Sequence, residues 1–173
     1  MSKKYNKILA FGDSLTRGFG AREGMSYPSQ IKKKTSIDII NAGINGEFSY
    51  EGVQRLPYLL GEHKPDLVIL CHGGNDIINN LSITELKTNL IKMIDLIQQH
   101  NAEVLLVGVP DYTYLDSLTH EVYDVVAYET KVALEDSIMS DIYKLNSLKS
   151  DYVHPNAKGY EMMAERFIKY LSI

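Results

Sequence analysis

A serine near the start of the chain and an aspartate and a histidine near its end have the residue types of a nucleophile and its base. Ser14 follows a short apolar run, and Asp151 and His154 lie just before the last predicted helix. A serine hydroxyl is a weak nucleophile at neutral pH, so it needs an imidazole to take its proton and an acid to hold that imidazole in one tautomer. The spacing of Asp151 and His154 lets the carboxylate reach Nδ1 while Nε2 faces outward. The sequence therefore predicts a Ser14, His154 and Asp151 triad.

Ser14 also has a purely structural interpretation. A serine after a strand is a common helix N-cap, and here it would open a helix through Leu15, Thr16 and Phe19 without any chemistry. Both interpretations explain a serine at this position, so other segments have to decide between them.

Two further segments favour chemistry, because residues 41–47 and 72–76 each follow a predicted strand. Attack on an ester carbonyl creates a negatively charged oxygen, which fixed N–H donors stabilise where water is excluded. Glycine suits this role because its bare backbone can approach a substrate closely. We expect Gly46, Asn75 and the backbone N–H of Ser14 to form this oxyanion hole. Each segment taken alone is also compatible with an ordinary turn.

With these four segments in this order, the chain resembles the SGNH hydrolases, also called the GDSL esterase and lipase family. The resemblance spans about residues 6–171, and the continuations at 15–20 and 154–160 are most like the small bacterial thioesterase, arylesterase and lysophospholipase group. It implies hydrolysis of small or lipid-like acyl esters or thioesters through an acyl-enzyme. The signature residues of the family correspond to Ser14, Gly46, Asn75, Asp151 and His154.

The chain departs from the family pattern at Phe48, where related enzymes more often carry a small hydroxylated residue. Residues 111–124 belong to a part of the fold that varies between relatives. His72, beside the oxyanion segment, is either a substrate contact or a hydrogen-bonded histidine at the rim of the sheet. Side chains near the four segments are our candidates for substrate binding: Leu15, Phe48, His72, Ile77, Tyr112 and Tyr114.

Short apolar runs mark the strands that must position these residues. Runs rich in Ile, Leu and Val that do not alternate with polar residues are typical of strands buried on both faces. They span 8–11, 37–41, 67–71 and 104–109, and a weakly marked fifth strand is expected near 137–142. Helical patterns cover 27–34, 53–60, 83–100 and 121–136, and a last helix begins at Pro155.

The alternation of strands and helices predicts a parallel sheet. With 173 residues, the chain has the length of one domain, which we expect to span 1–173. The expected fold is a single three-layer α/β/α domain with a flavodoxin-like, doubly wound parallel sheet of about five strands. Such sheets bind ligands beyond the carboxyl ends of their strands. Ser14, Gly46 and Asn75 each follow a strand, so they converge there whatever the family.

The composition argues against several other classes of protein. The formal charge is -4, from 22 acidic and 18 basic side chains, and the one basic run spans only 32–34, which argues against a nucleic-acid partner. No apolar span is long enough for a transmembrane helix. Residues 1–7 lead into too short an apolar stretch for a signal peptide, so we expect a cytoplasmic protein. The oligomeric state stays open.

Cys71 is the only cysteine, which excludes an intramolecular disulfide. It is a second candidate nucleophile because it precedes His72 at a strand end, although free cysteines are most often buried. No cluster of His, Cys or carboxylates has zinc spacing, so we expect neither a metal nor another cofactor. The glycines at 18, 20 and 24 match no phosphate-binding motif.

Two alternatives to hydrolysis of a small acyl ester or thioester stay open. The same machinery would remove acetyl groups from an O-acetylated carbohydrate. Sugar sites usually use aromatic platforms, and the chain has 12 tyrosines but no tryptophan. A non-catalytic flavodoxin-like binding module would share the fold, and the loss of a triad residue would indicate it. None is lost.

Overall fold

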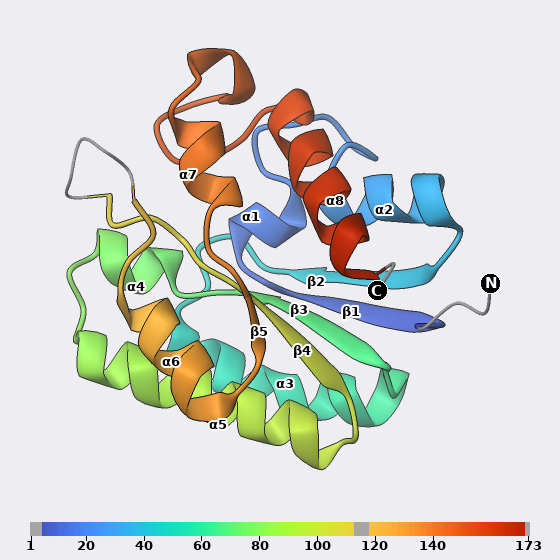
Figure 1. Cartoon of the computed structure of the whole chain (residues 1–173), viewed down its shortest axis with the longest axis vertical. Helices are drawn as coiled ribbons and strands as arrows, with labels where there is room; N and C mark the ends of the chain where they lie inside the picture. Colours follow the sequence, from blue (N-terminus) through green and yellow to red (C-terminus); the bar gives the residue numbers. More distant parts are fainter. Residues whose placement is uncertain (1–4, 113–117, 172–173) are drawn as a thin grey trace.

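Five parallel strands form one sheet in the computed structural model, which describes residues 5–112 and 118–171 (Figure 1). The order β2-β1-β3-β4-β5 is that of flavodoxin-like doubly wound sheets. The expected α/β fold with about five parallel strands is therefore confirmed. The strands are β1 (Lys7–Gly12), β2 (Asp38–Gly43), β3 (Leu67–Cys71), β4 (Glu103–Val107) and β5 (Ala133–Glu135).

Helices cover both faces of this sheet, as Figure 1 shows. One face carries α2 (Tyr27–Thr35), α7 (Ile138–Tyr143) and α8 (Ala157–Leu171). The other carries α3 (Ser49–His63), α5 (Ile83–Gln99) and α6 (Val122–Thr130). Two short helices, α1 (Ser14–Arg17) and α4 (Gly74–Ile78), begin soon after β1 and β3, and a 3₁₀ turn spans Asn146–Leu148.

Each of the two long helices buries an apolar stripe. On α5, the residues of this stripe are fully buried: Leu86, Leu90, Met93, Ile94 and Ile97. On α8, Phe167 packs edge-to-face against Tyr27 of α2, with ring centroids 5.0 Å apart. The Tyr27 hydroxyl also lies 3.0 Å from the Thr16 hydroxyl of α1. These contacts fix α8, and with it the histidine loop that precedes it, against the start of α1.

The C-terminal half differs from expectation at two elements. The fifth strand lies at Ala133–Glu135, and the segment 137–142 that was predicted as a strand belongs largely to helix α7. The helix predicted over 121–136 ends at Thr130, because Lys131 takes a left-handed conformation with φ 57°. A strand of three residues has too short an apolar pattern to be told from the end of a helix.

The last helix begins two residues later than predicted. The side-chain oxygen of Asn156 accepts hydrogen bonds from the backbone N–H groups of Lys158 (3.0 Å) and Gly159 (3.2 Å). Asn156 therefore caps the helix, and Pro155 lies outside it.

The neighbouring strands β2, β1 and β3 end at one level, which brings the functional loops together. Gly12, the last residue of β1, is paired with Gly43 of β2 on one side and with Cys71 of β3 on the other. A side chain at Gly12 would overlap the carbonyl oxygen of Cys71, so only glycine allows these strands to end so close to one another.

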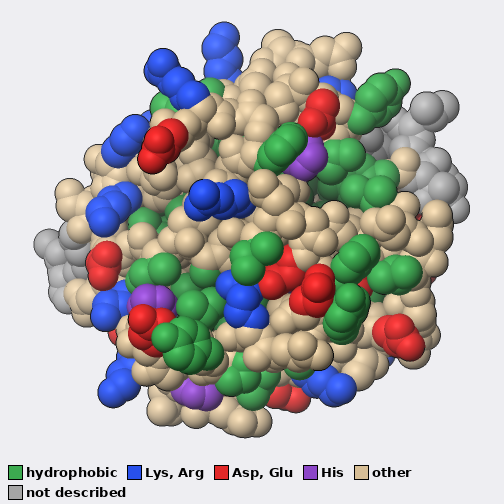
Figure 2. Space-filling model, turned by 180° about the vertical axis from the view of Figure 1, so that it is seen from behind, with side chains coloured by type: hydrophobic (Ala, Val, Ile, Leu, Met, Phe, Trp, Pro, Cys, Tyr) green, Lys and Arg blue, Asp and Glu red, His purple; other side chains and the backbone are tan. Residues whose placement is uncertain are grey.

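Figure 2 shows one face of the molecule, on which acidic and basic side chains of the described residues are interspersed and form no broad basic region. Within the described residues, the helices are all too short or too polar to cross a membrane.

Candidate active site

Ser14, His154 and Asp151 form a continuous chain of contacts at the carboxyl edge of the sheet. The Ser14 Oγ lies 3.0 Å from Nε2 of His154. Nδ1 of His154 lies 2.8 Å from Oδ2 and 3.0 Å from Oδ1 of Asp151. All three distances are those of hydrogen bonds. The imidazole thus bridges the hydroxyl and the carboxylate, as proton transfer from serine to histidine requires.

Asp13, and not Ser14, caps helix α1. Oδ1 of Asp13 accepts a hydrogen bond of 3.0 Å from the backbone N–H of Leu15, and Ser14 is the first residue of the helix. The structural interpretation of Ser14 as an N-cap is therefore wrong. Its side chain is left to contact His154, and its backbone N–H belongs to the first turn, where helices provide no acceptor.

The loop that carries His154 is held by its own hydrogen bonds. Oδ1 of Asp151 accepts from the backbone N–H groups of Val153 (2.8 Å) and His154 (2.7 Å). The Tyr143 hydroxyl of α7 donates to the carbonyl of Val153. Burial opposes ionisation of Asp151, but the hydrogen bonds from Val153 and His154 outweigh it and hold the pKa of this carboxyl below its usual value. Asp151 therefore presents a carboxylate to the imidazole.

Phe19 is a site residue that sequence reasoning missed. Its ring lies against the His154 imidazole, with centroids 4.5 Å apart, and its side chain stays half exposed. Its carbonyl accepts a hydrogen bond of 2.6 Å from the Tyr160 hydroxyl of α8. The only signal in the sequence was an aromatic residue between Gly18 and Gly20, close after Ser14.

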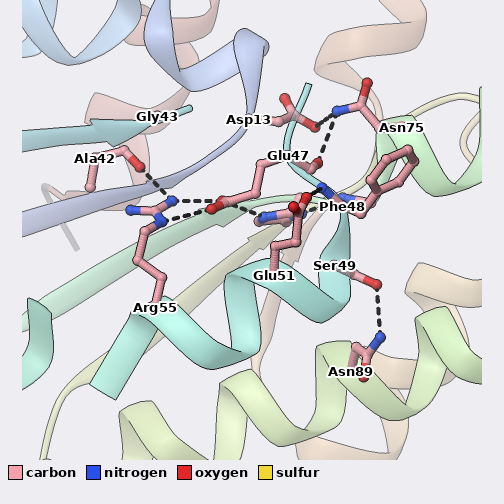
Figure 3. A network of polar contacts seen from close by, with 12 residues as sticks. Asp13, Ala42, Gly43, Glu47, Phe48, Ser49, Glu51, Arg55, Asn75 and Asn89 are labelled. Carbon is pink, nitrogen blue, oxygen red and sulfur yellow. Dashed lines mark hydrogen bonds and ion pairs between the residues drawn. The ribbon is translucent and has the colours of Figure 1, made fainter. Parts of the chain in front are cut away.

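Asn75 joins the two other functional loops, as Figure 3 shows. Its side-chain Nδ2 donates to the backbone carbonyl of Glu47 at 3.0 Å and faces Oδ2 of Asp13 at 3.4 Å. One amide proton is thus firmly held, whereas the second makes a long contact that an oxyanion could replace. Gly46 lies in an exposed turn with φ +76°, a conformation that favours glycine.

A buried carboxylate, Glu47, organises the turn beside Gly46. It accepts hydrogen bonds from Nε (2.7 Å) and Nη2 (2.6 Å) of Arg55. Nε2 of His72 lies 2.9 Å from Oε2 of Glu47, while Nδ1 of His72 accepts from the Gly73 N–H at 3.0 Å. Burial opposes ionisation of Glu47, but the hydrogen bonds from His72 and Arg55 outweigh it and lower the pKa of this carboxyl. The turn therefore rests on an ion pair below the surface (Figure 3).

Replacing Glu47 by glutamine is expected to destabilise the protein by about 3 kcal/mol, because Arg55 and His72 lose a buried carboxylate. At roughly 2–4 °C per kcal/mol for a chain of this size, Tm should fall by about 6–12 °C. The lowered pKa means that this stabilisation is present above the usual value of 4.5 and is lost as the pH falls through the folded-state pKa. Thermal unfolding followed by circular dichroism should therefore show that the difference in Tm between the wild type and Glu47→Gln becomes smaller in acid.

The matched control is Glu129→Gln, because Glu129 also forms a short ion pair, with Lys87 at 2.6 Å, but on the exposed surface. Exposed pairs contribute little to stability. Equal Tm losses in the two variants, or a Glu47→Gln difference independent of pH, would contradict the role given to Glu47.

Of the predicted substrate-binding residues, three are buried and need correction. Leu15 and His72 are fully buried, and neither presents a surface to a substrate. Leu15 packs in the core beneath α1, and His72 turns inward to Glu47. Ile77 also belongs to the core, with 7% of its surface exposed.

Two of the remaining candidates are half-buried beside the site. Phe48 stacks on Tyr50, with ring centroids 5.9 Å apart. A Cβ placed on Gly74 would lie 3.9 Å from the Tyr112 hydroxyl and 3.6 Å from Oδ2 of Asp13, so Tyr112 is close to the Asn75 loop. Tyr114 lies outside the described residues.

Cys71 is not a competing nucleophile. Its side chain is fully buried, and burial raises the pKa of its thiol well above the usual value, so the reactive thiolate is disfavoured. Within residues 5–112 and 118–171, no group of three or more His, Cys, Asp or Glu side chains is arranged to hold a metal ion.

Comparison with known proteins identifies the family. The sequence model of the GDSL-like Lipase/Acylhydrolase family matches residues 10–162. The chain is 29% identical over 185 residues to an arylesterase of Vibrio mimicus, covering 98% of this chain and 92% of that protein. It is 28% identical over 172 residues to thioesterase 1/protease 1/lysophospholipase L1 of Escherichia coli K12, covering 95% and 82%.

A solved structure gives the same result. The psychrotrophic esterase EstA from Pseudoalteromonas sp. superposes with a TM-score of 0.84 and 27% identity, covering 97% of this chain and 100% of that one. The family resemblance expected from the sequence is thus confirmed over most of the chain. We conclude that this protein belongs to the GDSL-like lipase/acylhydrolase family and is a carboxylic ester hydrolase.

Proposed function

We propose that the protein hydrolyses acyl esters or thioesters through a Ser14, His154 and Asp151 triad and an acyl-enzyme. The observation that carries the proposal is the unbroken chain of contacts from the Ser14 hydroxyl through the imidazole to the Asp151 carboxylate. Relatives named arylesterase and thioesterase support the ester and thioester substrate classes.

The first half-reaction forms the acyl-enzyme. Nε2 of His154 takes the Ser14 proton as Oγ attacks the acyl carbonyl, and the developing oxyanion accepts hydrogen bonds from the backbone N–H groups of Ser14 and Gly46 and from the Asn75 amide. His154 then gives its proton to the departing alcohol or thiol, and the bond between that group and the acyl carbon breaks.

The second half-reaction releases the acid. Water gives a proton to Nε2 of His154 and attacks the acyl carbon. His154 then returns that proton to Oγ of Ser14 as the bond between Oγ and the acyl carbon breaks. Throughout, the Asp151 carboxylate keeps a proton on Nδ1 of His154, so that Nε2 alternately accepts and donates.

The direct test is hydrolysis of p-nitrophenyl esters of increasing acyl length, with matching acyl-CoA thioesters, by the wild type and by Ser14→Ala protein. Serine-dependent turnover supports the proposal, and the chain-length optimum sizes the acyl site. Absence of turnover on the whole panel by folded protein would contradict it.

We propose further that Phe48 and Tyr112 shape the acyl site. Replacing either by alanine removes apolar surface that an acyl chain would cover, at about 0.8 kcal/mol per buried methylene or roughly fourfold in kcat/KM. The ratio of kcat/KM for octanoate to that for butyrate esters should therefore change about three- to tenfold, with acetate little affected.

Tyr128→Ala is the matched control for this experiment, because Tyr128 is 87% exposed on α6. Chain-length profiles of the Phe48 and Tyr112 variants that superimpose on the wild-type profile would reject the assignment.

A further inference from the structure

A cleft of about 560 Å³ opens beside the proposed triad. Phe19 forms part of its wall, and the same side chain lies against the His154 ring. Asn45, which directly precedes Gly46, forms another part. The cleft thus adjoins the proposed base through one residue and the proposed oxyanion turn through another.

The charge of the cleft is mainly positive. Arg17 and Arg22 line it, both are exposed, and neither forms an ion pair with any described residue. Nζ of Lys33 lies 2.9 Å from the carbonyl of Gly24, which also lines the cleft. Glu23 is the one acidic side chain among the lining residues. The lining therefore carries two cationic side chains and one carboxylate, and the Lys33 ammonium lies next to the lining residue Gly24.

The proposed mechanism indicates which part of a substrate would lie near the cleft. The leaving group must lie beside Nε2 of His154, because that atom supplies its proton. Phe19 lies against the same imidazole and forms part of the wall of the cleft. A leaving group beside Nε2 would therefore lie next to the cleft that Arg17 and Arg22 also line.

We propose that this cleft binds the leaving group of the ester and selects leaving groups that carry a negative charge, such as a carboxylate or a phosphate. Guanidinium groups bind both anions through paired N–H donors, which suits the two uncommitted arginines. The amide side chains of Asn41 and Asn45 add neutral polar groups to the same wall. The inference rests on the proposed function, since it assigns a leaving group to the proposed base.

The test uses acetate esters of phenols that differ in charge: p-acetoxybenzoate as the anion, phenyl acetate as the neutral ester and p-acetoxy-N,N,N-trimethylanilinium as the cation. The variant is Arg17→Gln/Arg22→Gln, and the quantity is the ratio of kcat/KM for the anionic to that for the neutral ester. Because each ester is compared between two proteins, intrinsic reactivity cancels. We expect this ratio to fall about three- to tenfold, since exposed charge pairs are individually weak.

The neutral ester should be hydrolysed at nearly the wild-type rate by the double variant, and the cationic ester should gain. Added salt should weaken the anion preference of the wild type, as it screens exposed charges. Arg17→Lys/Arg22→Lys keeps the charge and should retain most of the preference. Lys92→Gln removes an exposed charge from α5 and should leave the ratio unchanged.

A second pair of esters separates the leaving group from the acyl group. The p-nitrophenyl monoester of glutaric acid carries its charge on the acyl side, and p-nitrophenyl valerate is its neutral counterpart. Arginine-dependent preference for the glutarate ester, without preference for p-acetoxybenzoate, would overturn the assignment to the leaving group. An unchanged anion ratio in the double variant would overturn the proposal as a whole.

Failure of the proposed function looks different, because the neutral ester would then also be inert. In that case titration of p-hydroxybenzoate followed by NMR still tests the cleft. Shifts confined to residues 17–26 and 41–45, and lost in the double variant, support the anion site, whereas their absence in the wild type rejects it.

Discussion

Replacing Ser14 by alanine is expected to lower kcat on p-nitrophenyl esters by a factor on the order of 10⁴ or more. In the proposed mechanism, only the Ser14 hydroxyl forms the covalent bond to the acyl group. Among the described contacts of the His154 ring, Ser14 is also the only hydroxyl that the imidazole could deprotonate. The remaining activity should come from direct attack of water on an ester whose developing oxyanion the donors stabilise.

This loss can be separated from unfolding because Ser14 contributes little to the fold. Asp13 caps the helix, and the Ser14 side chain contacts only His154 among the hydrogen bonds of the described residues. The variant should therefore keep the wild-type Tm within a few degrees. Ser147→Ala, at an exposed position, is the matched control for the substitution itself. A fluorophosphonate should add one adduct to the wild type and none to Ser14→Ala.

Near wild-type turnover in Ser14→Ala would remove the serine from the mechanism. Labelling of the variant at another residue would show which nucleophile replaces it. Both outcomes would leave the family assignment intact, since that assignment does not depend on the role of any single residue.

Local patterns of apolar residues were sufficient to predict most of the strands and helices. The strand predicted at 67–71 has those bounds in the structure, and α5 differs from its prediction by one residue. The strand is apolar enough, and the helix long enough, for the pattern of apolar residues to tell a strand from a helix. β5 spans only Ala133–Glu135, and its strand character depends on pairing with β4, a contact that the local sequence does not contain.

The sequence was sufficient to predict those site residues whose type and position after a strand indicate their role. Ser14, Gly46 and Asn75 follow three strands that end side by side, which topology alone indicates. The orientation of His72 was not predictable in this way, because a residue at a strand end can face either layer. It turns inward because Glu47, from another loop, supplies a buried partner. The contact of Phe19 with His154 likewise joins residues far apart in the sequence.

Asp151→Asn is expected to lower kcat by a factor on the order of 10³ to 10⁴, through the wrong tautomer of His154. Oδ1 of Asp151 accepts hydrogen bonds from two backbone N–H groups, so an asparagine would keep its carbonyl oxygen there. Its NH₂ group would then occupy the Oδ2 position, 2.8 Å from Nδ1 of His154, and donate to it. Nδ1 would become an acceptor, and the proton would move to Nε2.

With a proton on Nε2, the neutral imidazole cannot accept the Ser14 proton, although every atom keeps its place. The readout beyond turnover is therefore ¹⁵N NMR of the histidine ring, which should show the proton on Nδ1 in the wild type and on Nε2 in Asp151→Asn. Asp136→Asn, at an exposed position, should change neither measurement. Lost turnover with the proton still on Nδ1 would mean that Asp151 acts by holding the loop through Val153 and His154, and not by orienting the imidazole.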